Sequence, residues 1–575
     1  MKTVLNTKKS RQNGLSDVKE CSPMRNINLR YVNEAYEDGI VSKYRLKYPD
    51  NFNWAYDVVD DIADNDPDRL AMLWCDPTGA ERRFTFGDIK KYSNKTANFL
   101  RSAGIEKGDI VMVVLKRNYE FWYTAVALHK LGAVIVPATF MLTGHDVEYR
   151  VNSGGIKAVI STSQCEAPDS VDEVFDHCPT LDTRIIVRGE REGWLTFESG
   201  VEAASEDFER VDTKVSDPLL IFFSSGTSGY PKMVLHNHTY PLAHLWTAKH
   251  WHNVNPDGLH FTIADTGWGK AVWGKFYGQW LMEAAVLTYD YDKFETSEIL
   301  GLLEKYKVTT LCVPPTMYRM LLGDKNFEKY DLSSLTYCTT AGEAMNPDVF
   351  LKWKQLTGIT IMEGFGQTET TVALCNVVGS TPKPGSLGKP SLQYPVYLID
   401  DEGNFCARGK TGEIVIDVKN GKAEGILDCY YLNKDKTDEA FEGGWYHTGD
   451  TAWMDEDGYY WYVGRNDDII KSSGYRIGPF EIESVMVNHP AVQECAVTGV
   501  PDPVRGQLVK ATVVLADGYT ESEELRTELQ TYVKKNTAPY KYPRVINFVP
   551  ELPKTVNGKI RRVEIRTEDV RDAIN

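Results

Sequence analysis

Short apolar runs, each bounded by polar or glycine residues, recur along the first two thirds of the chain. The runs 110–115, 133–136, 158–160 and 219–223 are too short for helices and predict buried strands. Between most of them, apolar residues recur every three or four positions, which is the spacing of a helix with one buried face. Alternating strands and helices predict a mostly parallel sheet that is covered by helices.

The ends of the predicted helices carry polar and glycine signals. Asp88 and Asn118 each precede a segment of helical spacing, and we expect them to cap these helices. Gly104 and Gly132 follow the same segments and are expected to end them. Thr143 begins a shorter helix.

The alternation continues past residue 300. The runs 311–313, 335–339 and 359–362 predict further strands, and the segments between them predict helices that end at Leu322 and span 347–356. Ligands bind beyond the carboxyl ends of strands in such sheets. Two polar turns fall in that position, 341–344 and 364–370.

The pattern changes towards residue 400. From 385 to 418, short strands and turns predict an antiparallel, barrel-like appendage. After Arg465 the order of elements is that of a small α+β domain. We expect helices at 479–488 and 522–535 and strands at 495–498, 510–515 and 545–549.

The expected fold class is therefore α/β. A chain of 575 residues exceeds one ordinary core and should divide into domains. We expect a disordered lead-in at 1–40 and a large N-terminal domain of layered parallel sheets with the small β subdomain at 41–465. A small, mobile α+β domain at 466–575 completes the chain.

Composition narrows the function classes. Apolar residues make up 42% and charged residues 25%, as in a soluble globular protein, and no run of 18 apolar residues predicts a membrane span. Residues 1–16 lack the apolar core of a secretory signal. A net charge of −17 argues against nucleic acid as a partner. The ten cysteines form no C-x-x-C pair, which suits reduced thiols in the cytoplasm.

The most distinctive stretch follows the run 219–223. It crowds hydroxyls and glycines before a lysine, in Ser224, Ser225, Gly226, Thr227, Ser228, Gly229, Tyr230, Pro231 and Lys232. Glycines let backbone N–H groups approach a ligand, while hydroxyls and a lysine attract an oxyanion. The loop therefore suits a polyphosphate. Its spacing is neither that of a Walker A loop nor that of a dinucleotide fingerprint, and a flexible turn is the alternative interpretation.

Two other charged or polar clusters bear on ligands. Between residues 534 and 566, nine lysines and arginines stand against two glutamates, which predicts an anionic partner for the small domain. A solvated basic face is the alternative. His236, His238 and His244 also cluster, but no cysteine or carboxylate completes a zinc ligand set, and we expect no metal there.

Six motifs occur in one order along the chain. They are the loop ending in Lys232, Gly342-Glu343, Gly366-Gln367-Thr368-Glu369-Thr370, Tyr446-His447-Thr448-Gly449-Asp450, Gly464-Arg465 and Pro553-Lys554-Thr555-Val556-Asn557-Gly558-Lys559. Across residues 50 to 570 this order resembles the adenylate-forming superfamily, which includes acyl-CoA synthetases, nonribosomal-peptide adenylation domains and luciferases. It is most similar to the AMP-forming medium-chain acyl-CoA synthetases.

The resemblance implies an ATP site. It places pyrophosphate in the loop 224–232, adenine at Gly342 and Glu343, the ribose hydroxyls at Asp450 and Arg465, and Mg²⁺ at Glu369. Lys232, Thr368 and Lys559 would be catalytic, because positive charge and oriented donors must act where a carboxylate attacks the α-phosphate. Glu363, Gly364, Phe365, Gly366 and Gln367 would complete the ATP-binding set. Taken singly, Glu369 is also explained as a solvated carboxylate, Asp450 as a turn residue and Lys559 as part of a basic tail.

The resemblance also implies a CoA site and a hinge. Ser473, Gly474, Tyr475 and Arg476 match the segment that lines the pantetheine, and Arg505, Tyr540, Lys541 and Tyr542 match positions at the CoA nucleotide. Cationic and aromatic groups suit an anionic adenine nucleotide. Asp467 falls at the position about which the family's small domain rotates between half-reactions.

The acyl pocket is the least defined part. In acetyl-CoA synthetases a tryptophan stands before the Gln-Thr-Glu-Thr stretch and closes the pocket; this chain has Gly366 there, which implies a longer pocket. The family builds this pocket with the segment 264–273, in which Trp268 follows the family pattern while Lys270 and Trp273 depart from it. We expect a short-to-medium-chain acid, branched acids included. Trp273 either narrows the pocket or packs in the core.

Three functions follow from these features. The first is an acyl-CoA synthetase that uses a carboxylic acid, ATP, Mg²⁺ and CoA. The second is an adenylating enzyme that delivers the acyl group to another acceptor, such as a carrier protein. The third is a non-catalytic nucleotide-binding protein. Arg505 and the basic tail favour the first function. The sequence does not show the oligomeric state, and a homodimer is compatible with it.

Overall fold

The structure is a computed structural model that describes residues 26–224, 231–473, 475–554 and 560–574. Seven of the predicted site residues lie outside these ranges: Ser225, Gly226, Thr227, Ser228, Gly229, Gly474 and Lys559.

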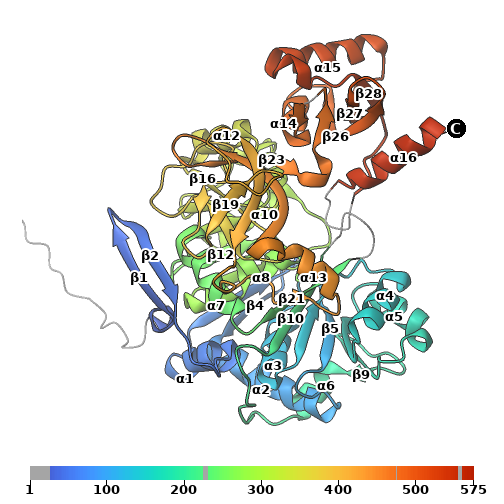
Figure 1. Ribbon diagram of the computed structural model, residues 1–575. Helices are drawn as coiled ribbons and strands as arrows, with labels where there is room; N and C mark the ends of the chain where they lie inside the picture. Colours follow the sequence, from blue (N-terminus) through green and yellow to red (C-terminus); the bar gives the residue numbers. More distant parts are fainter. Residues whose placement is uncertain (1–25, 225–230, 474, 555–559, 575) are drawn as a thin grey trace, which may run out of the picture.

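Two large sheets, with the helices that cover them, make up most of the chain (Figure 1). The first follows the order β21 (Cys429–Tyr430), β11 (Lys232–Asn237), β10 (Pro218–Ser224), β6 (Val134–Pro137), β5 (Ile110–Val114), β7 (Ala158–Thr162), β8 (Thr183–Val187) and β9 (Leu195–Thr196). From β10 to β9 neighbouring strands are parallel, and β11 and β21 extend one edge in antiparallel pairing. The strands predicted at 110–115, 133–136, 158–160 and 219–223 are confirmed.

The second large sheet lies next to the first. Its order is β18 (Lys389–Pro390), β17 (Val372–Cys375), β16 (Ile361–Gly366), β15 (Tyr337–Thr340), β14 (Thr310–Cys312), β12 (Leu259–Thr262), β13 (Ala285–Tyr289), β3 (Leu70–Cys75) and β4 (Glu81–Thr85). The strands from β16 to β3 are parallel, as predicted for an α/β fold. The turn predicted at 364–370 begins later, because β16 continues to Gly366 in antiparallel pairing with β17.

Smaller sheets follow. The appendage is a four-stranded antiparallel sheet, β19 (Val396–Ile399), β20 (Thr411–Asp417), β22 (Trp445–Met454) and β23 (Tyr460–Arg465). The small domain contains β25 (Tyr475–Ile477), β24 (Ile470–Ser472), β27 (Gly506–Leu515) and β26 (Val492–Asp502), with β28 (Val545–Phe548) beside β27. At the beginning of the described chain, β1 (Val32–Glu37) and β2 (Ile40–Leu46) pair as a hairpin. Residues 26–40 of the predicted lead-in are therefore folded, and disorder was the wrong expectation for this part.

Helices cover both large sheets. The α-helices are α1 (Asp61–Asn65), α2 (Phe86–Ser102), α3 (Glu120–Leu131), α4 (Gly144–Gly154), α5 (Ala167–Val174), α6 (Phe197–Ala203), α7 (Tyr240–Trp246), α8 (Gly269–Lys275), α9 (Tyr277–Leu281), α10 (Thr296–Lys305), α11 (Pro315–Leu322), α12 (Pro347–Thr357), α13 (Lys434–Ala440), α14 (Pro479–Met486), α15 (Glu523–Asn536) and α16 (Arg562–Ile574). Short 3₁₀ turns are η1 (Ile27–Arg30), η3 (Phe175–His177), η5 (Phe327–Lys329), η6 (Glu442–Gly444), η7 (Asn466–Asp468) and η8 (Pro539–Lys541), and π-helical turns are η2 (Ala55–Asp60) and η4 (Thr247–Trp251).

Two of the predicted caps need correction. Helix α2 begins after Thr85, whose hydroxyl accepts a hydrogen bond from the backbone of Asp88, while the Asp88 carboxylate accepts one from the backbone of Thr85. Asp88 is thus the third residue of a capping box and not the cap itself. The Asn118 side chain donates to Gln164 and Asp290, so it connects loops and does not cap α3. Thr143 caps α4, and Gly132 ends α3 in the left-handed conformation, as predicted.

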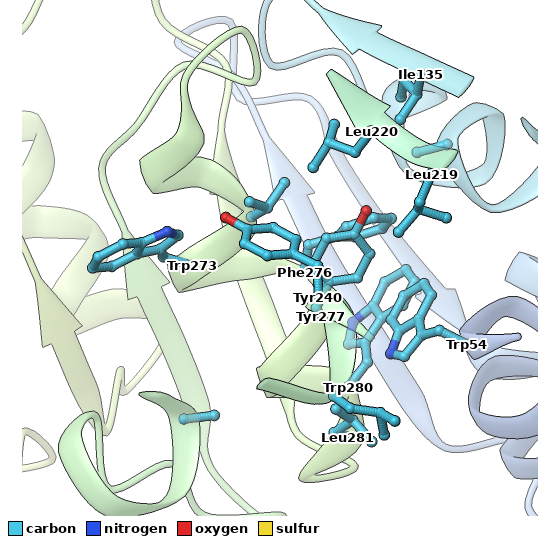
Figure 2. Close-up of a cluster of buried hydrophobic side chains, with 14 of the residues drawn as sticks. Trp54, Ile135, Leu219, Leu220, Tyr240, Trp273, Phe276, Tyr277, Trp280 and Leu281 are labelled. Atoms are coloured by element: carbon cyan, nitrogen blue, oxygen red, sulfur yellow. The ribbon is translucent and has the colours of Figure 1, made fainter. Parts of the chain in front are cut away.

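The small domain has its own core. Buried side chains between Ile470 and Ile546 form a cluster that is separate from those of the large sheets. In the largest cluster Trp54 stacks on Trp280, with ring centroids 5.7 Å apart, and Figure 2 shows Trp273 at the edge of this aromatic group. Figure 1 shows α14, α15 and the strands of the small domain above the β subdomain. The small domain is therefore packed around buried side chains of its own.

Replacement of Thr85 by alanine should loosen the first turn of α2, because the hydroxyl that accepts from the Asp88 N–H is lost and only the bond from the backbone N–H of residue 85 to the Asp88 carboxylate remains. We expect a loss of about 1 kcal/mol of stability and faster amide hydrogen exchange at 86–89, measured by mass spectrometry. The matched control is Thr196→Ala. Thr196 precedes α6 without a side-chain cap bond, so its loss should have a smaller effect on α6. Equal effects in both helices would contradict the role of the capping box.

Candidate functional site

The side chain of Gln367 joins two of the motifs. Its Nε2 donates to Asp450 Oδ2 at 2.5 Å and to the Thr448 carbonyl at 2.8 Å, and its Oε1 accepts from the Tyr446 hydroxyl at 2.7 Å. Gln367 follows β16 of a large sheet, whereas the other three residues lie on β22 of the β subdomain. The amide therefore fixes one motif against the other.

Asp450 is held from three sides. The Tyr462 hydroxyl donates to its Oδ1 at 2.9 Å, and Arg465 Nη1 lies 3.5 Å from its Oδ2. The residue is only 5% exposed. Burial lowers the pKa of Arg465, but Asp450 and Asp467 raise it by more, so the guanidinium stays charged. The carboxylate is thus oriented before any ligand arrives, as a ribose diol would require.

The two ends of the hydroxyl-rich loop are brought together by a hairpin. Ser224 at the end of β10 faces Lys232 at the start of β11. Lys232 Nζ lies 4.9 Å from the centre of the Tyr430 ring, and the Tyr430 hydroxyl donates to Glu369 Oε1 at 3.1 Å. The cation at the end of the loop and the predicted metal ligand therefore share one aromatic neighbour. The central residues of the loop lie outside the described chain.

Thr368 is fixed through its backbone. The Nε2 of His236 donates to the Thr368 carbonyl at 2.8 Å, and the His236 ring stacks on Tyr240 with centroids 3.8 Å apart. Burial lowers the pKa of His236 to about 4, so the ring is neutral and keeps one N–H for this bond. His236 is therefore a structural neighbour of the site.

The predicted adenine segment leaves space beside the backbone. Gly342 has a φ of +99°, and a Cβ built there meets no described atom within 4 Å. The Glu343 carboxylate accepts a bond from Thr316 at 2.8 Å. Lys270 Nζ donates to the Ala341 carbonyl at 2.7 Å. Lys270 belongs to the predicted acyl segment, and its bond to Ala341 joins that segment to the predicted adenine segment.

Two glycines of β16, Gly364 and Gly366, each lie against a tryptophan ring. A Cβ at Gly364 would lie 2.7 Å from the Trp251 ring, and one at Gly366 would lie 2.4 Å from Trp273 Cη2. Only glycine fits at either position, because an added carbon needs more than 3 Å. Trp273 therefore occupies the space beside Gly366 from another element of the fold.

Glu363 lies inside this strand and is a buried acid. Its Oε1 accepts from the Met345 backbone at 3.0 Å, and its Oε2 has no hydrogen-bond partner among the described residues. Burial raises the pKa of Glu363 to about 8, so the carboxyl is mainly protonated at neutral pH. Phe365, two residues later, lies beside Tyr462, with ring centroids 6.4 Å apart.

The residues present fit ATP and Mg²⁺. Oriented hydrogen-bond acceptors, a charged guanidinium and the Lys232 cation surround one region, as a nucleotide polyphosphate needs. In the described chain no group of three or more His, Cys, Asp or Glu could hold a metal ion. A single carboxylate such as Glu369 still suits Mg²⁺, which commonly takes one or two protein carboxylates and completes its shell with phosphate oxygens and water.

The small domain brings most of the predicted CoA residues together. The backbone N–H of Ser473 donates to the Arg505 carbonyl at 2.8 Å, and Tyr475 stacks on Tyr540 with centroids 4.1 Å apart. Both tyrosine rings are well exposed. Lys541 pairs with Glu481, and Tyr542 contacts Lys534 and Arg544. Arg476 lies on β25 between these groups in sequence.

The predicted hinge carries paired charges. Arg465 Nε lies 3.7 Å from Asp467, and the next residue, Asp468, pairs with Arg562 and Arg566 of α16. Asn488 of the small domain also forms side-chain hydrogen bonds with Asn346 and Asp348. Beside these polar contacts, Tyr462 of the β subdomain lies next to Phe480 of α14, with ring centroids 6.3 Å apart.

Sequence reasoning did not single out four residues that hold the site together. Tyr446 and Tyr462 support Gln367 and Asp450, Tyr430 supports Glu369, and Trp251 supports Gly364. Tyr446 carries a signal, because it begins the motif that ends in Asp450. Separately, no helix within the described ranges is long and apolar enough to cross a membrane.

Comparisons with known proteins agree with this geometry. The pattern of the AMP-binding enzyme family matches residues 59–431, and that of the AMP-binding enzyme C-terminal domain matches 481–559. The chain is 42% identical over 539 residues to human mitochondrial acyl-coenzyme A synthetase ACSM5 and 41% identical over 536 residues to human mitochondrial ACSM3. These matches cover 92% of this chain, and 92% and 91% of the two relatives.

Solved structures give the same result. The anthranilate CoA ligase AuaEII, in complex with anthranoyl-AMP, superposes with a TM-score of 0.84 at 30% identity, covering 92% of this chain and 99% of that one. An acyl-CoA synthetase from Brucella canis superposes with a TM-score of 0.70 at 32% identity, covering 92% and 96%. The chain therefore belongs to the AMP-binding enzymes, in the branch of the acyl-coenzyme A synthetases.

Proposed function

We propose that the protein joins a carboxylic acid to CoA in two steps, with ATP converted to AMP and pyrophosphate. In the first step the acid attacks the α-phosphate of ATP to give an acyl-adenylate and pyrophosphate. In the second, the CoA thiol displaces AMP and forms the thioester. The observation that carries this proposal is the bridge from Gln367 to Asp450, because it assembles the ribose and α-phosphate motifs into one site.

The chain's own residues have distinct roles in the first step. Asp450, oriented by Tyr462 and Gln367, binds the ribose diol. Thr368 donates to the α-phosphate, and Lys232 holds the departing pyrophosphate. Glu369, fixed by Tyr430, binds Mg²⁺, which neutralises phosphate charge. These groups supply oriented positive charge where negative charge develops.

The second step uses the small domain. The exposed Tyr475–Tyr540 stack and the cations around Tyr542 form a surface suited to the adenine and phosphates of CoA. Rotation of the small domain about Asp467 would remove Lys559 from the active site and bring this surface to it. The rotation would have to break the polar contacts at Asn488 and the contact of Tyr462 with Phe480 of α14, whose ring centroids lie 6.3 Å apart.

The substrate is a short-to-medium-chain carboxylic acid. Gly366 leaves no side chain of its own in the pocket, and Trp273 takes the adjacent space instead. We infer that the pocket accepts chains longer than acetate and that Trp273 limits their length.

The remaining expectations concern compartment and assembly. All nine cysteines of the described chain are free, which suits a reducing compartment such as the cytoplasm. The relatives named above are mitochondrial, so the mitochondrial matrix is the alternative, and fractionation of cells that produce the protein separates the two. A homodimer is also proposed, and light scattering of the purified chain tests it.

The overall activity is tested with ATP, Mg²⁺ and a panel of carboxylic acids, with and without CoA. Pyrophosphate release and a CoA thioester support the proposal. Acyl-AMP without thioester would support an adenylating enzyme with another acceptor, and no turnover with any acid would support a non-catalytic nucleotide-binding protein. Omission of Mg²⁺ should abolish pyrophosphate release.

Replacement of Lys559 by alanine should separate the two steps. Loss of an oriented charge should slow acyl-adenylate formation at least ~10²-fold. Thioester formation from supplied acyl-adenylate should persist, because Lys559 leaves the site in that step. Single-turnover kinetics of each step measure this. Lys554→Ala, in the same basic tail, is the matched control and should slow neither step; an equal loss in both steps for Lys559→Ala would contradict the role.

Replacement of Trp273 by leucine should lengthen the preferred chain. The smaller side chain opens the space beside Gly366, so kcat/KM for a ten-carbon acid relative to a four-carbon acid should rise about 10-fold, or roughly 1.4 kcal/mol. Trp280→Leu, which removes a buried indole elsewhere in the same cluster, controls for general loosening of the core. If both variants keep the parent profile, Trp273 only packs in the core.

A further inference from the structure

The Asp450 motif lies in an interruption of the β20–β22 ladder. Glu413 pairs with Thr451, and Val415 pairs with His447. One residue of β20 therefore faces three residues of β22, Thr448, Gly449 and Asp450. Extra residues of this kind form a bulge that loses its regular hydrogen bonds. Other groups must satisfy the backbone there.

Side chains supply the missing bonds. Glu413 Oε1 accepts from the Gly449 N–H at 2.9 Å and so takes the place of a strand carbonyl. Thr448 Oγ1 donates to the Ile414 carbonyl at 2.6 Å and accepts from the Asp450 N–H at 3.1 Å. The shape of the bulge, and hence the direction of Asp450, depends on these contacts.

Arg465 lies on the side of the bulge opposite to Glu413. Gly449 has a φ of +68°, and a Cβ there would lie 3.1 Å from Arg465 Nη2. Arg465 also lies 3.4 Å from the Thr448 carbonyl. Gly449 is thus held between the Glu413 carboxylate and the Arg465 guanidinium. Displacement of Glu413 would move both groups that are assigned to the ribose.

Glu413 is itself held by a histidine. Its Oε2 lies 3.1 Å from His447 Nδ1, and His447 Nε2 lies 3.3 Å from the Glu442 carbonyl. Both ring nitrogens therefore face acceptors. A neutral imidazole has one N–H and can satisfy only one of them, whereas the imidazolium satisfies both.

The surroundings of His447 favour its charged form. The bond to Glu413 outweighs burial and raises the pKa of His447 above its ordinary value. A cavity of about 370 Å³ adjoins the ring and is also lined by Asp400, Asp401 and Glu402. Glu442 adds further negative charge, while Arg465 lies beyond Gly449.

We propose that Glu413 and His447 are positioning residues for the nucleotide site. The protonated His447 keeps Glu413 on the Gly449 N–H, and this contact keeps Asp450 and Arg465 aligned for the two ribose hydroxyls. Loss of the proton leaves one N–H for two acceptors and removes the positive charge beside Glu413, so Glu413 is held less firmly and nucleotide binding weakens. The inference rests on the proposed function, because it assumes that Asp450 binds ribose.

The pH dependence has a definite sign. The bound proton is present below the raised pKa of His447, so nucleotide affinity is highest there and falls as the pH rises through that value. Chemistry after binding is unaffected. We expect KM for ATP and Kd for AMP to rise about 10-fold between pH 6 and pH 9, with little change in kcat.

Three variants of the full chain test this proposal by isothermal titration calorimetry with AMP and by KM for ATP across that range. His447→Gln keeps a donor but cannot titrate, so its Kd should be nearly independent of pH. Glu413→Gln keeps an acceptor for the Gly449 N–H but lacks the negative charge that raises the pKa of His447. The loss of nucleotide affinity should therefore occur at lower pH in this variant. Glu528→Gln is the matched control, because Glu528 pairs with His489 at 3.2 Å in the small domain, and its profile should equal that of the parent.

The parent protein alone provides a second test if a variant fails to fold. AMP and 2′,3′-dideoxy-AMP carry the same phosphate but differ in the ribose hydroxyls. Affinity for AMP should fall with pH much more than affinity for the dideoxy compound. Equal pH dependence for both ligands, or an unchanged profile in a folded His447→Gln variant, would overturn the proposal. Absence of any CoA thioester would instead refute the proposed function, and AMP binding would still report on the positioning pair.

Discussion

The amide of Gln367 connects two different sheets. It donates to Asp450 and to the Thr448 carbonyl and accepts from Tyr446, so a strand of a large sheet is held against β22 of the β subdomain. Asp450 is almost fully buried, and a buried carboxylate is unstable unless charged and polar groups surround it. Gln367, Tyr462 and Arg465 provide these groups. The same bonds that stabilise the charge also fix its direction.

Close packing sets the other side of the site. Gly364 and Gly366 lie two residues apart on β16 and therefore face the same side of the strand. Trp251 and Trp273 fill the volume that side chains would take at these positions. Glycine in a strand interior is destabilising by itself, and its presence twice indicates a requirement for close approach. At these two positions β16 therefore has room for no more than its backbone.

Most strands and the order of the motifs followed from the sequence, because apolar runs and glycine or hydroxyl signals are local. The predictions that were wrong depended on which of several possible partners a side chain contacts. Asp88 is a residue type that often caps helices, yet Thr85 caps α2, and the Asn118 side chain bonds to Asp290, which follows β13. The strand β16 extends into a predicted turn because β17 pairs with it. The role of Tyr462 could not be predicted, since its contact with Asp450 depends on the pairing of β22 with β23, which the sequence pattern does not show.

Arg465 lies between the proposed ribose ligand, Asp450, and the proposed hinge residue, Asp467. One guanidinium lies 3.5 Å from Asp450 and 3.7 Å from Asp467, and it is only partly exposed. Rotation about Asp467 would alter the second contact and, through it, the field at the first. The adjoining Asp468 forms ion pairs with Arg562 and Arg566 of α16. The segment 465–468 is therefore attached to Asp450 through Arg465 and to the small domain through Asp468. If Asp450 binds the ribose and the small domain rotates about Asp467, as proposed, a group shared in this way would couple the position of the small domain to the affinity for the ribose.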